Sequence, residues 1–255
     1  MDTILISIAA LLAALLTFFT GFGLGTLLLP VCALFMPVEH AVALTALVHL
    51  VNGVFKFALV APHTSWRIVA AFGLPAVAAS LVGAWLLLRF AGAAPLAQYE
   101  IAGHAFQITP AKLVVGFLLA AFAVIEILPA LRNLTFARRH FFIGGLLSGF
   151  FGGLAGMQGA LRSAFLVRAG LTKEQFVGTG AAIACLIDIT RLGVYLPAIR
   201  SAPLERELLA AAALAAIAGA LLGSKLLGKV TLATVQVMVA VLLLVVAAGL
   251  VSGLL

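Results

Sequence analysis

The residues best suited to chemistry are polar and ionisable side chains inside stretches that are otherwise apolar. Asn52 and Lys56 are four residues apart, so they share one face of a helix, and His49 lies three residues before Asn52 on the same side. Asp188 and Arg191 are three residues apart and can pair locally. In a segment that crosses a bilayer, an ionisable residue costs roughly 2.5–3.5 kcal/mol, which makes it a functional candidate.

The signs of these charges indicate the kind of ligand. Arg162 follows Gln158 by four residues, and together with Lys56 and Arg191 it outweighs the single carboxylate of Asp188. A cation site would need an excess of carboxylates instead. Arginines and the N-termini of helices both favour oxyanions, so the set predicts a site for a small anion.

Each of these residues also has a structural explanation. Lys56 and Arg191 can extend to an interface from the last turns of their helices, and Arg162 can lie near the end of a helical hairpin. Asp188 can be a structural partner of Arg191, and His49 can be an interior histidine with its hydrogen bonds satisfied. If transport is coupled to protons, His49 and Asp188 are the candidates for carrying them.

The composition is that of an integral membrane protein. Of 255 residues, 65% are hydrophobic and only 9% are charged, with a mean hydropathy of +1.29, whereas a soluble domain carries about 25% charged residues. The apolar runs lack the period-2 alternation of barrel strands, so they predict helices that cross a lipid bilayer. The net charge of +7 comes mostly from residues at the ends of apolar runs, where they orient the chain, and no basic-aromatic cluster is present, so no nucleic-acid partner is predicted.

Cofactors and enzymatic chemistry find no support in the sequence. Cys32 and Cys185 lie in apolar stretches without a CxxC motif or a Cys/His cluster, so we expect two free thiols, no metal and no cofactor. Neither an H-E-x-x-H zinc-protease motif nor a G-x-S-x-G nucleophile elbow is present. Ser148 has Gly149 beside it but no glycine two residues before or two residues after it. An intramembrane enzyme is therefore the weakest alternative. No nucleotide-binding motif is present either, so a gradient or a separate subunit must supply any energy.

The apolar segments that must position these residues occur in the same order in both halves of the chain. Each half begins with an apolar region interrupted by glycines and continues with three unbroken spans. The regions are 4–36 (broken near 20–25), 38–60, 66–88 and 110–131, then 141–167 (broken between 149 and 159), 172–196, 204–227 and 231–253. Residues 91–109 are less apolar and predict a loop that covers one face of the molecule.

Two pairs of residues indicate an internal repeat. Gly25 stands twenty residues before Thr45 and Gly159 stands twenty before Thr179, a common offset of 134. We predict one transmembrane domain, 1–255, built from repeat one (1–131), a basic connector (132–140) and repeat two (141–255). Broken helices at matching places in two halves indicate a transport site. The alternative is that the glycines only let helices pack closely, as in GxxxG motifs.

The basic residues predict how the repeats are oriented. If each broken region crosses the membrane once, the basic residues divide six against six and give no bias. If each is a re-entrant helical hairpin, they divide eight against four: Arg67, Arg132, Arg138, Arg139, Arg168, Lys173, Lys225 and Lys229 against Arg89, Lys112, Arg200 and Arg206. The expected fold is thus all-α, with two inverted repeats, each a glycine-broken re-entrant hairpin plus three transmembrane helices, and both termini outside.

Short motifs in both halves resemble the TauE/SafE family of sulfite exporters, over nearly the whole chain. The first is Gly21-Phe22-Gly23-Leu24-Gly25 with Pro30, then Ala43-Leu44-Thr45-Ala46 and Asn52-Gly53; the second is the stretch from Leu147 to Gly159, then Gly178-Thr179-Gly180. The chain departs from the family pattern at Ala46 and Gly180, where serine is common, at Met157-Gln158 and at Arg162. The resemblance implies that the cargo is sulfite or a related organosulfur anion, with Thr45 and Thr179 as hydroxyl donors.

Together these observations predict a secondary transporter, not an enzyme, that exports a small sulfur-containing oxyanion across a bacterial inner membrane. The anion would bind near the midplane at the N-termini of half-helices. The expected site consists of backbone donors, polar side chains and cations: Gly23, Gly25, Gly156, Gly159, Thr45, Thr179, Asn52, Gln158, Lys56, Arg162 and Arg191. The alternatives are an anion channel or a transporter of another small carboxylate. The sequence leaves the oligomeric state open and is compatible with a homo-oligomer.

Overall fold

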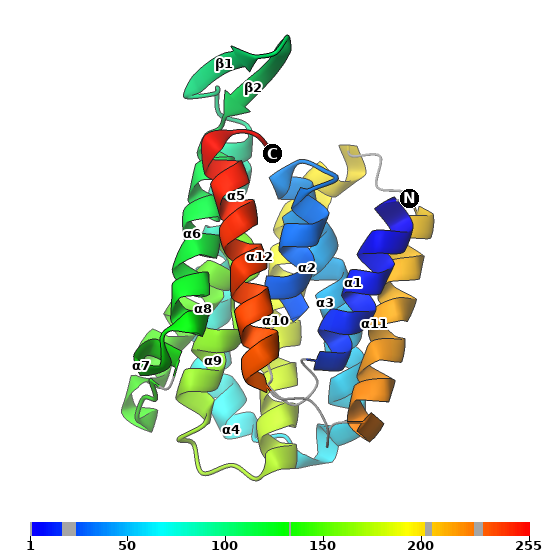
Figure 1. The fold of residues 1–255 in the computed structure, drawn as a ribbon. Coiled ribbons are helices and arrows are strands. Elements are labelled where there is room, and N and C mark those ends of the chain that lie inside the picture. The colour runs from blue at the N-terminus through cyan, green and yellow to red at the C-terminus, as the bar shows by residue number, and fades with distance from the viewer. Residues whose placement is uncertain (1, 17–23, 133, 202–205, 227–231) are drawn as a thin grey trace.

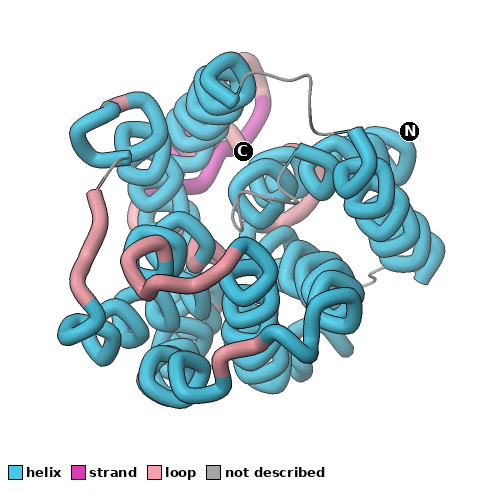
Figure 2. Tube along the Cα trace, turned by 90° about the horizontal axis from the view of Figure 1, so that it is seen from below, coloured by secondary structure: helices cyan, strands magenta, loops and turns pink. Residues whose placement is uncertain are grey.

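The apolar segments form a bundle of helices, because in lipid only a helix or a closed barrel satisfies its own backbone hydrogen bonds. The computed structural model describes residues 2–16, 24–132, 134–201, 206–226 and 232–255. Its long helices run roughly along one direction (Figure 1). Figure 2 views the bundle along that direction, so that most helices appear end-on and loops cross the near end.

The helices of the first half follow the predicted segments closely. They are α1 (Asp2–Leu16), α2 (Leu24–Ala33), α3 (Val38–Val60), α4 (Trp66–Ile68), α5 (Leu74–Ala91), α6 (Pro110–Ile127) and α7 (Pro129–Arg132). A 3-10 turn, Ala61–His63, follows α3, and a π-helical turn, Val69–Gly73, joins α4 to α5. The start of α6 is capped: the Thr109 hydroxyl accepts a hydrogen bond from the Lys112 amide at 3.2 Å, and Pro110 occupies the first turn.

The second half contains α8 (Phe141–Ala155), α9 (Gly159–Leu166), α10 (Lys173–Ser201), α11 (Arg206–Leu226) and α12 (Leu232–Ser252). A 3-10 turn, Arg138–His140, precedes α8. The glycine break predicted in this half falls at Gly156, where α8 ends in the left-handed region at φ 74°, a conformation that glycine adopts without strain. The break predicted near 20–25 lies mostly outside the described residues, and its last two residues, Leu24 and Gly25, begin α2.

The segment predicted as a loop, 91–109, contains a β-hairpin, which the all-α prediction missed. Strands β1 (Ala97–Ile101) and β2 (His104–Ile108) pair antiparallel, with Gly103 at φ 80° in the turn. Tyr99 stacks on Phe106 at a ring distance of 5.5 Å and donates a hydrogen bond from its hydroxyl to the Ser252 carbonyl. The hairpin projects beyond the helices at the end where the C-terminus lies (Figure 1).

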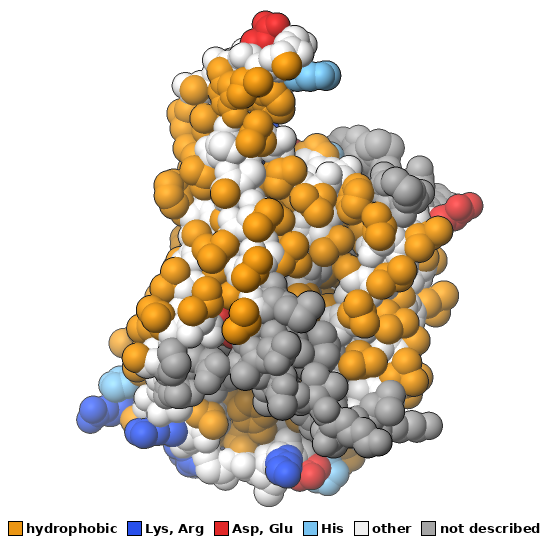
Figure 3. Space-filling model, viewed as in Figure 1, with side chains coloured by type: hydrophobic (Ala, Val, Ile, Leu, Met, Phe, Trp, Pro, Cys, Tyr) orange, Lys and Arg blue, Asp and Glu red, His pale blue; other side chains and the backbone are white. Residues whose placement is uncertain are grey.

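Length and composition allow several helices to cross a membrane. Within the described residues, four are long and apolar enough: Val38–His63, Trp66–Ala91, Pro110–Ile127 and Lys173–Pro197. Large apolar side chains such as Trp66, Phe117 and Leu214 are exposed on the outside of the bundle. Figure 3 shows hydrophobic side chains over the middle of one face, with Lys and Arg gathered at the end opposite the hairpin. Lipid is the solvent that suits such a surface.

Glycines bring α8 and α5 into close contact. Gly145, Gly149 and Gly153 of α8 lie against the backbones of Phe72, Ala76 and Ser80, so that any Cβ there would overlap a carbonyl oxygen. These glycines therefore pack helices, which is the alternative that the sequence left open. Helix α1 packs on α11 in a similar way, with Gly219 against the backbone of Leu11, while α3 packs on α10 and α6 on α12.

Candidate functional site

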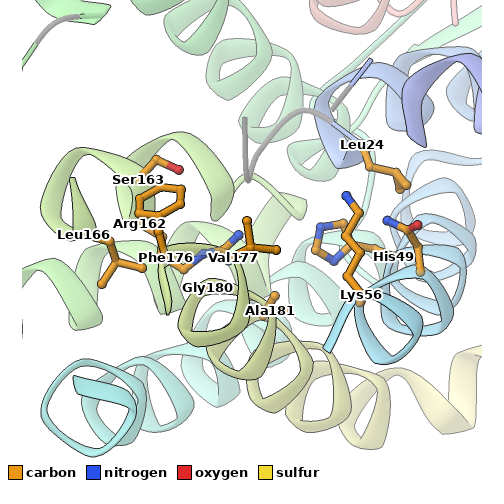
Figure 4. Close-up of a pocket in the computed structure, with 13 residues that line it drawn as sticks. Leu24, His49, Lys56, Arg162, Ser163, Leu166, Phe176, Val177, Gly180 and Ala181 are labelled. Carbon is orange, nitrogen blue, oxygen red and sulfur yellow. The ribbon is translucent and has the colours of Figure 1, made fainter. Parts of the chain in front are cut away.

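A polar pocket lies between α3, α9 and α10, with the first described residue of α2 at its edge. It encloses about 510 Å³ of space, including its open mouth. Two helix faces line most of it: His49, Asn52, Gly53 and Lys56 of α3, and Phe176, Val177, Gly180, Ala181 and Ala184 of α10. Leu24, Arg162, Ser163 and Leu166 complete the lining. In Figure 4, Arg162 lies on one side and His49 and Lys56 on the other.

The α3 face contributes three of the predicted polar residues. His49, Asn52 and Lys56 line the pocket together, as their helical spacing requires. Asn52 is 2% exposed, and its Oδ1 has no hydrogen-bond partner within the described part of the chain. A buried amide oxygen without a partner is costly in a folded protein unless a ligand or water completes it.

Arg162 brings a second cation to the pocket from α9. Its side chain is only 3% exposed, and its Nη1 donates a hydrogen bond to Gln158 Oε1 at 3.0 Å. Gln158 is itself fixed at both ends. Its backbone carbonyl oxygen accepts a hydrogen bond from the Ser148 hydroxyl at 3.0 Å, and its side-chain Nε2 donates one to Asp188 Oδ1 at 2.9 Å. The guanidinium is therefore held in one orientation at the wall of the pocket.

Behind the pocket, Asp188 of α10 contacts side chains from α3 and from the helix break between α8 and α9. Its Oδ1 accepts hydrogen bonds from Arg191 Nε and from Gln158 Nε2, each at 2.9 Å. Its Oδ2 lies 2.5 Å from His49 Nδ1. Both Asp188 and Arg191 are completely buried, so the charge of each is balanced by the other and by hydrogen bonds.

The glycine at the break also contacts this network. Arg191 Nη1 donates a hydrogen bond to the Gly152 carbonyl at 3.2 Å and lies 2.9 Å from the position of a Cβ on Gly156. On its other side, the Gly156 carbonyl oxygen lies 2.9 Å from the position of a Cβ on Gly25 in α2. The helix break in the second half of the chain thus contacts the start of α2 in the first half.

Several predicted site residues do not line the pocket within the described part of the chain. Thr179 is buried in α10, where its hydroxyl accepts a hydrogen bond from the Ser65 amide at 3.0 Å, and Thr45 is buried in α3 beside Gly25. Gly159 is the first residue of α9, and the residues of this helix that line the pocket are Arg162, Ser163 and Leu166. Gln158, Asp188, Arg191, Gly25 and Gly156 lie behind the wall, and Gly23 is outside the described residues.

The lining residues that sequence reasoning missed are mostly small or apolar. On α10 they are Val177, Gly180, Ala181 and Ala184, together with Phe176. The first four recur at i, i+3, i+4 and i+7, which is one face of a helix, and Asp188 and Arg191 continue that face. The recurrence of small residues on the face that carries the buried ion pair is the signal that could have identified them.

A bundle of apolar helices, several of them long enough to cross a bilayer, defines a class of protein, the multi-pass membrane proteins. A comparison with protein families identifies the particular family: the sulfite exporter TauE/SafE family model matches residues 6–250, so the chain belongs to that family. No curated protein matches the chain. Membership makes this chain a membrane transporter of the sulfite and anion exporter type, and not an enzyme.

Proposed function

We propose that the protein is a secondary transporter that exports a small sulfur-containing oxyanion across the bacterial inner membrane. The pocket between α3, α9 and α10 is the proposed binding site. The observation that carries the proposal is the charge of that pocket: Lys56 and Arg162 lie on opposite sides of it, and none of its described lining residues is acidic. An oxyanion between the two cations would compensate both charges.

The proposed contacts follow from the donors that the pocket presents. The planar guanidinium of Arg162 can donate two parallel hydrogen bonds to two oxygens of one anion, and Lys56 adds a compact charge. Asn52 and Ser163 supply neutral hydrogen-bonding groups to the same space. Gln158, Asp188 and Arg191 act from behind as positioning residues. The proposed ligand is small, as sulfite or a short organosulfonate is, because the pocket is narrow and much of its 510 Å³ of space belongs to the open mouth.

The proposed architecture is a pair of inverted repeats, 1–131 and 141–255, joined by the connector 132–140. The packing of the helices supports it, because the main contacts between the two halves occur in matching pairs. Helix α5 packs on α8 as α11 packs on α1, while α3 packs on α10 and α6 on α12. In Figure 1, α3 and α10 run in opposite directions, and so do α6 and α12, as inversion requires.

The distribution of charge supports an orientation in the membrane. The Lys and Arg side chains visible in Figure 3 gather at the end opposite the β-hairpin. Cytoplasmic loops carry the excess of basic residues, so that end is proposed to face the cytoplasm. Both termini and the hairpin would then lie outside.

The test is sulfite efflux from proteoliposomes that contain the purified protein. Loss of a hydrogen bond to a charged group costs about 1.5–3 kcal/mol, so Lys56→Gln and Arg162→Gln should each raise KM for sulfite roughly tenfold or more. Lys173→Gln and Arg139→Gln are matched controls, because both side chains are exposed and lie outside the pocket. Their KM should equal that of the wild type.

The results separate the proposal from its alternatives. Saturable efflux that depends on Lys56 and Arg162 supports a transporter with its site in this pocket. Efflux that rises linearly with concentration would support a channel instead. Transport of small carboxylates with no transport of sulfite, sulfate or sulfonates would contradict the proposed substrate class. Equal KM values in the pocket and control variants would remove the pocket from the proposal.

A further inference from the structure

His49 connects the pocket to the buried carboxylate of Asp188. Its Nδ1 lies 2.5 Å from Asp188 Oδ2, and Oδ1 of the same carboxylate pairs with Arg191 Nη2 at 2.8 Å. An ionised carboxylate only accepts hydrogen bonds, so the hydrogen between them belongs to His49 Nδ1. In the neutral imidazole, Nε2 is then a bare acceptor.

The position of the ring makes that nitrogen accessible from the pocket. His49 lines the pocket, and its side chain is 13% exposed. Because Nδ1 is engaged by Asp188, Nε2 is the ring nitrogen that can exchange a proton with the contents of the pocket. Once protonated, Nε2 donates a hydrogen bond, which is what an oxyanion accepts.

The charges around His49 make protonation depend on the anion. Lys56 and Arg162 line the same pocket as His49, and the ion pair of Asp188 and Arg191 lies directly behind the ring. An anion in the pocket offsets the cations and therefore favours the protonated ring. Linkage is reciprocal, so a protonated ring binds the anion more tightly to the same extent.

Other ionisable groups on the helices packed against α3 lie outside the pocket lining. Those whose side chains the structure describes are Cys32 of α2, Arg89 of α5, Lys112 and Glu126 of α6, Glu207 of α11, and Lys173, Glu174, Cys185 and Tyr195 of α10. Tyr195 donates its hydroxyl hydrogen to the Gly153 carbonyl. His63, in the turn after α3, is exposed. Asp188 is therefore the acidic group in contact with His49.

We propose that His49 is the proton carrier of this transporter, and that each anion binds together with one proton on His49 Nε2. Asp188 is the positioning residue that fixes the tautomer and leaves Nε2 free for that proton. The inference rests on the proposed function, because it concerns the same pocket. It adds that the transported unit is an anion plus a proton, so a gradient of either one drives movement of the other.

The test counts the protons taken up when an anion binds. Titration calorimetry in two buffers of different ionisation enthalpy gives that number at each pH from about 5 to 8, the range in which an imidazole can exchange protons. Methanesulfonate is the probe, because it stays deprotonated over that range, so the counted proton belongs to the protein. The wild type should take up a large fraction of one proton per anion, and His49→Gln none, since glutamine keeps a donor for Asp188 but cannot titrate. His63→Gln is the control and should behave as the wild type.

A second measurement needs only the wild-type protein. An outward gradient of methanesulfonate should move protons out of proteoliposomes that contain a pH-sensitive dye, and protein-free vesicles should show no such change. Anion binding without proton uptake, or uptake that persists in His49→Gln, would overturn the inference and leave the anion site intact. Failure of the wild type to bind methanesulfonate, sulfate or sulfite would overturn the proposed function itself.

Discussion

Gly25 of α2 lies directly against the carbonyl oxygen of Gly156, so that a Cβ on Gly25 would be 2.9 Å from that oxygen. The oxygen belongs to the backbone and cannot move aside as a flexible side chain would. Gly25→Ala should therefore destabilise the protein by about 1–3 kcal/mol, as overpacking in a close-packed interior does. The expected readout is a fall of several degrees in the melting temperature of the protein in detergent.

Gly193 of α10 provides the matched control, because a Cβ there would meet nothing within 4 Å. Gly193→Ala should leave the melting temperature unchanged or raise it, since alanine stabilises a helix interior by about 1 kcal/mol relative to glycine. Equal melting temperatures for the two variants would show that the contact between Gly25 and Gly156 is not tight in solution.

The two members of the buried ion pair, Asp188 and Arg191, should not contribute independently to stability. Asp188→Asn leaves the Arg191 guanidinium buried without its counter-charge, and such a loss costs about 3–5 kcal/mol. The double variant Asp188→Asn with Arg191→Met removes the stranded charge. Its destabilisation should be smaller than the sum of the two single values, as measured by thermal unfolding in a double-mutant cycle. Simple additivity would mean that the pair is not coupled.

Helix positions and short-range pairs could be predicted from the sequence, because both depend on local spacing. The predicted span 38–60 coincides with α3, and Asp188 and Arg191 pair as residues three apart can. The break at Gly156 was expected because clustered glycines weaken a helix. Each of these features follows from a pattern within a few turns of one segment.

Contacts between distant segments could not be predicted in this way. The approach of His49 to Asp188 joins residues 139 positions apart, and no local pattern encodes it. Thr179 is a predicted donor to the anion, and its hydroxyl also accepts a hydrogen bond from the Ser65 amide, a contact that depends on how α10 packs at the start of α4. The strands at 97–108 are short and mostly exposed, so they lack the hydrophobic alternation that identifies a buried strand.

Gln158 should affect substrate affinity although it does not line the pocket. It accepts the hydrogen bond of Arg162 Nη1 at 3.0 Å and so fixes the guanidinium. Gln158→Met keeps a similar volume and removes that hydrogen bond, so KM for the anion should rise several-fold, in line with about 1–3 kcal/mol for a group left unpaired. Efflux kinetics are the measurement, and the exposed Gln98 provides the control variant Gln98→Met. A KM equal to that of the wild type would show that Arg162 is positioned without Gln158.

Cysteine labelling should reveal which end of the bundle faces the cytoplasm. With Cys32 and Cys185 replaced by alanine, a single cysteine is introduced as Glu100→Cys, at an exposed position of the hairpin, or as Arg139→Cys in the connector. A membrane-impermeant maleimide should label the hairpin variant in intact cells and the connector variant only after the membrane is opened. The reverse pattern would invert the proposed orientation, and labelling of both in intact cells would contradict the topology.

The exchange of packing partners between the two halves has a consequence for how the chain is assembled. The glycine face of α8 is covered by α5, and α1 is covered by α11, so each half provides the partner for the first helix of the other. Neither half could bury its own surfaces alone, as in an obligate heterodimer. A gene divided within the segment encoding 132–140 should therefore yield two fragments that are degraded when expressed singly and accumulate when expressed together.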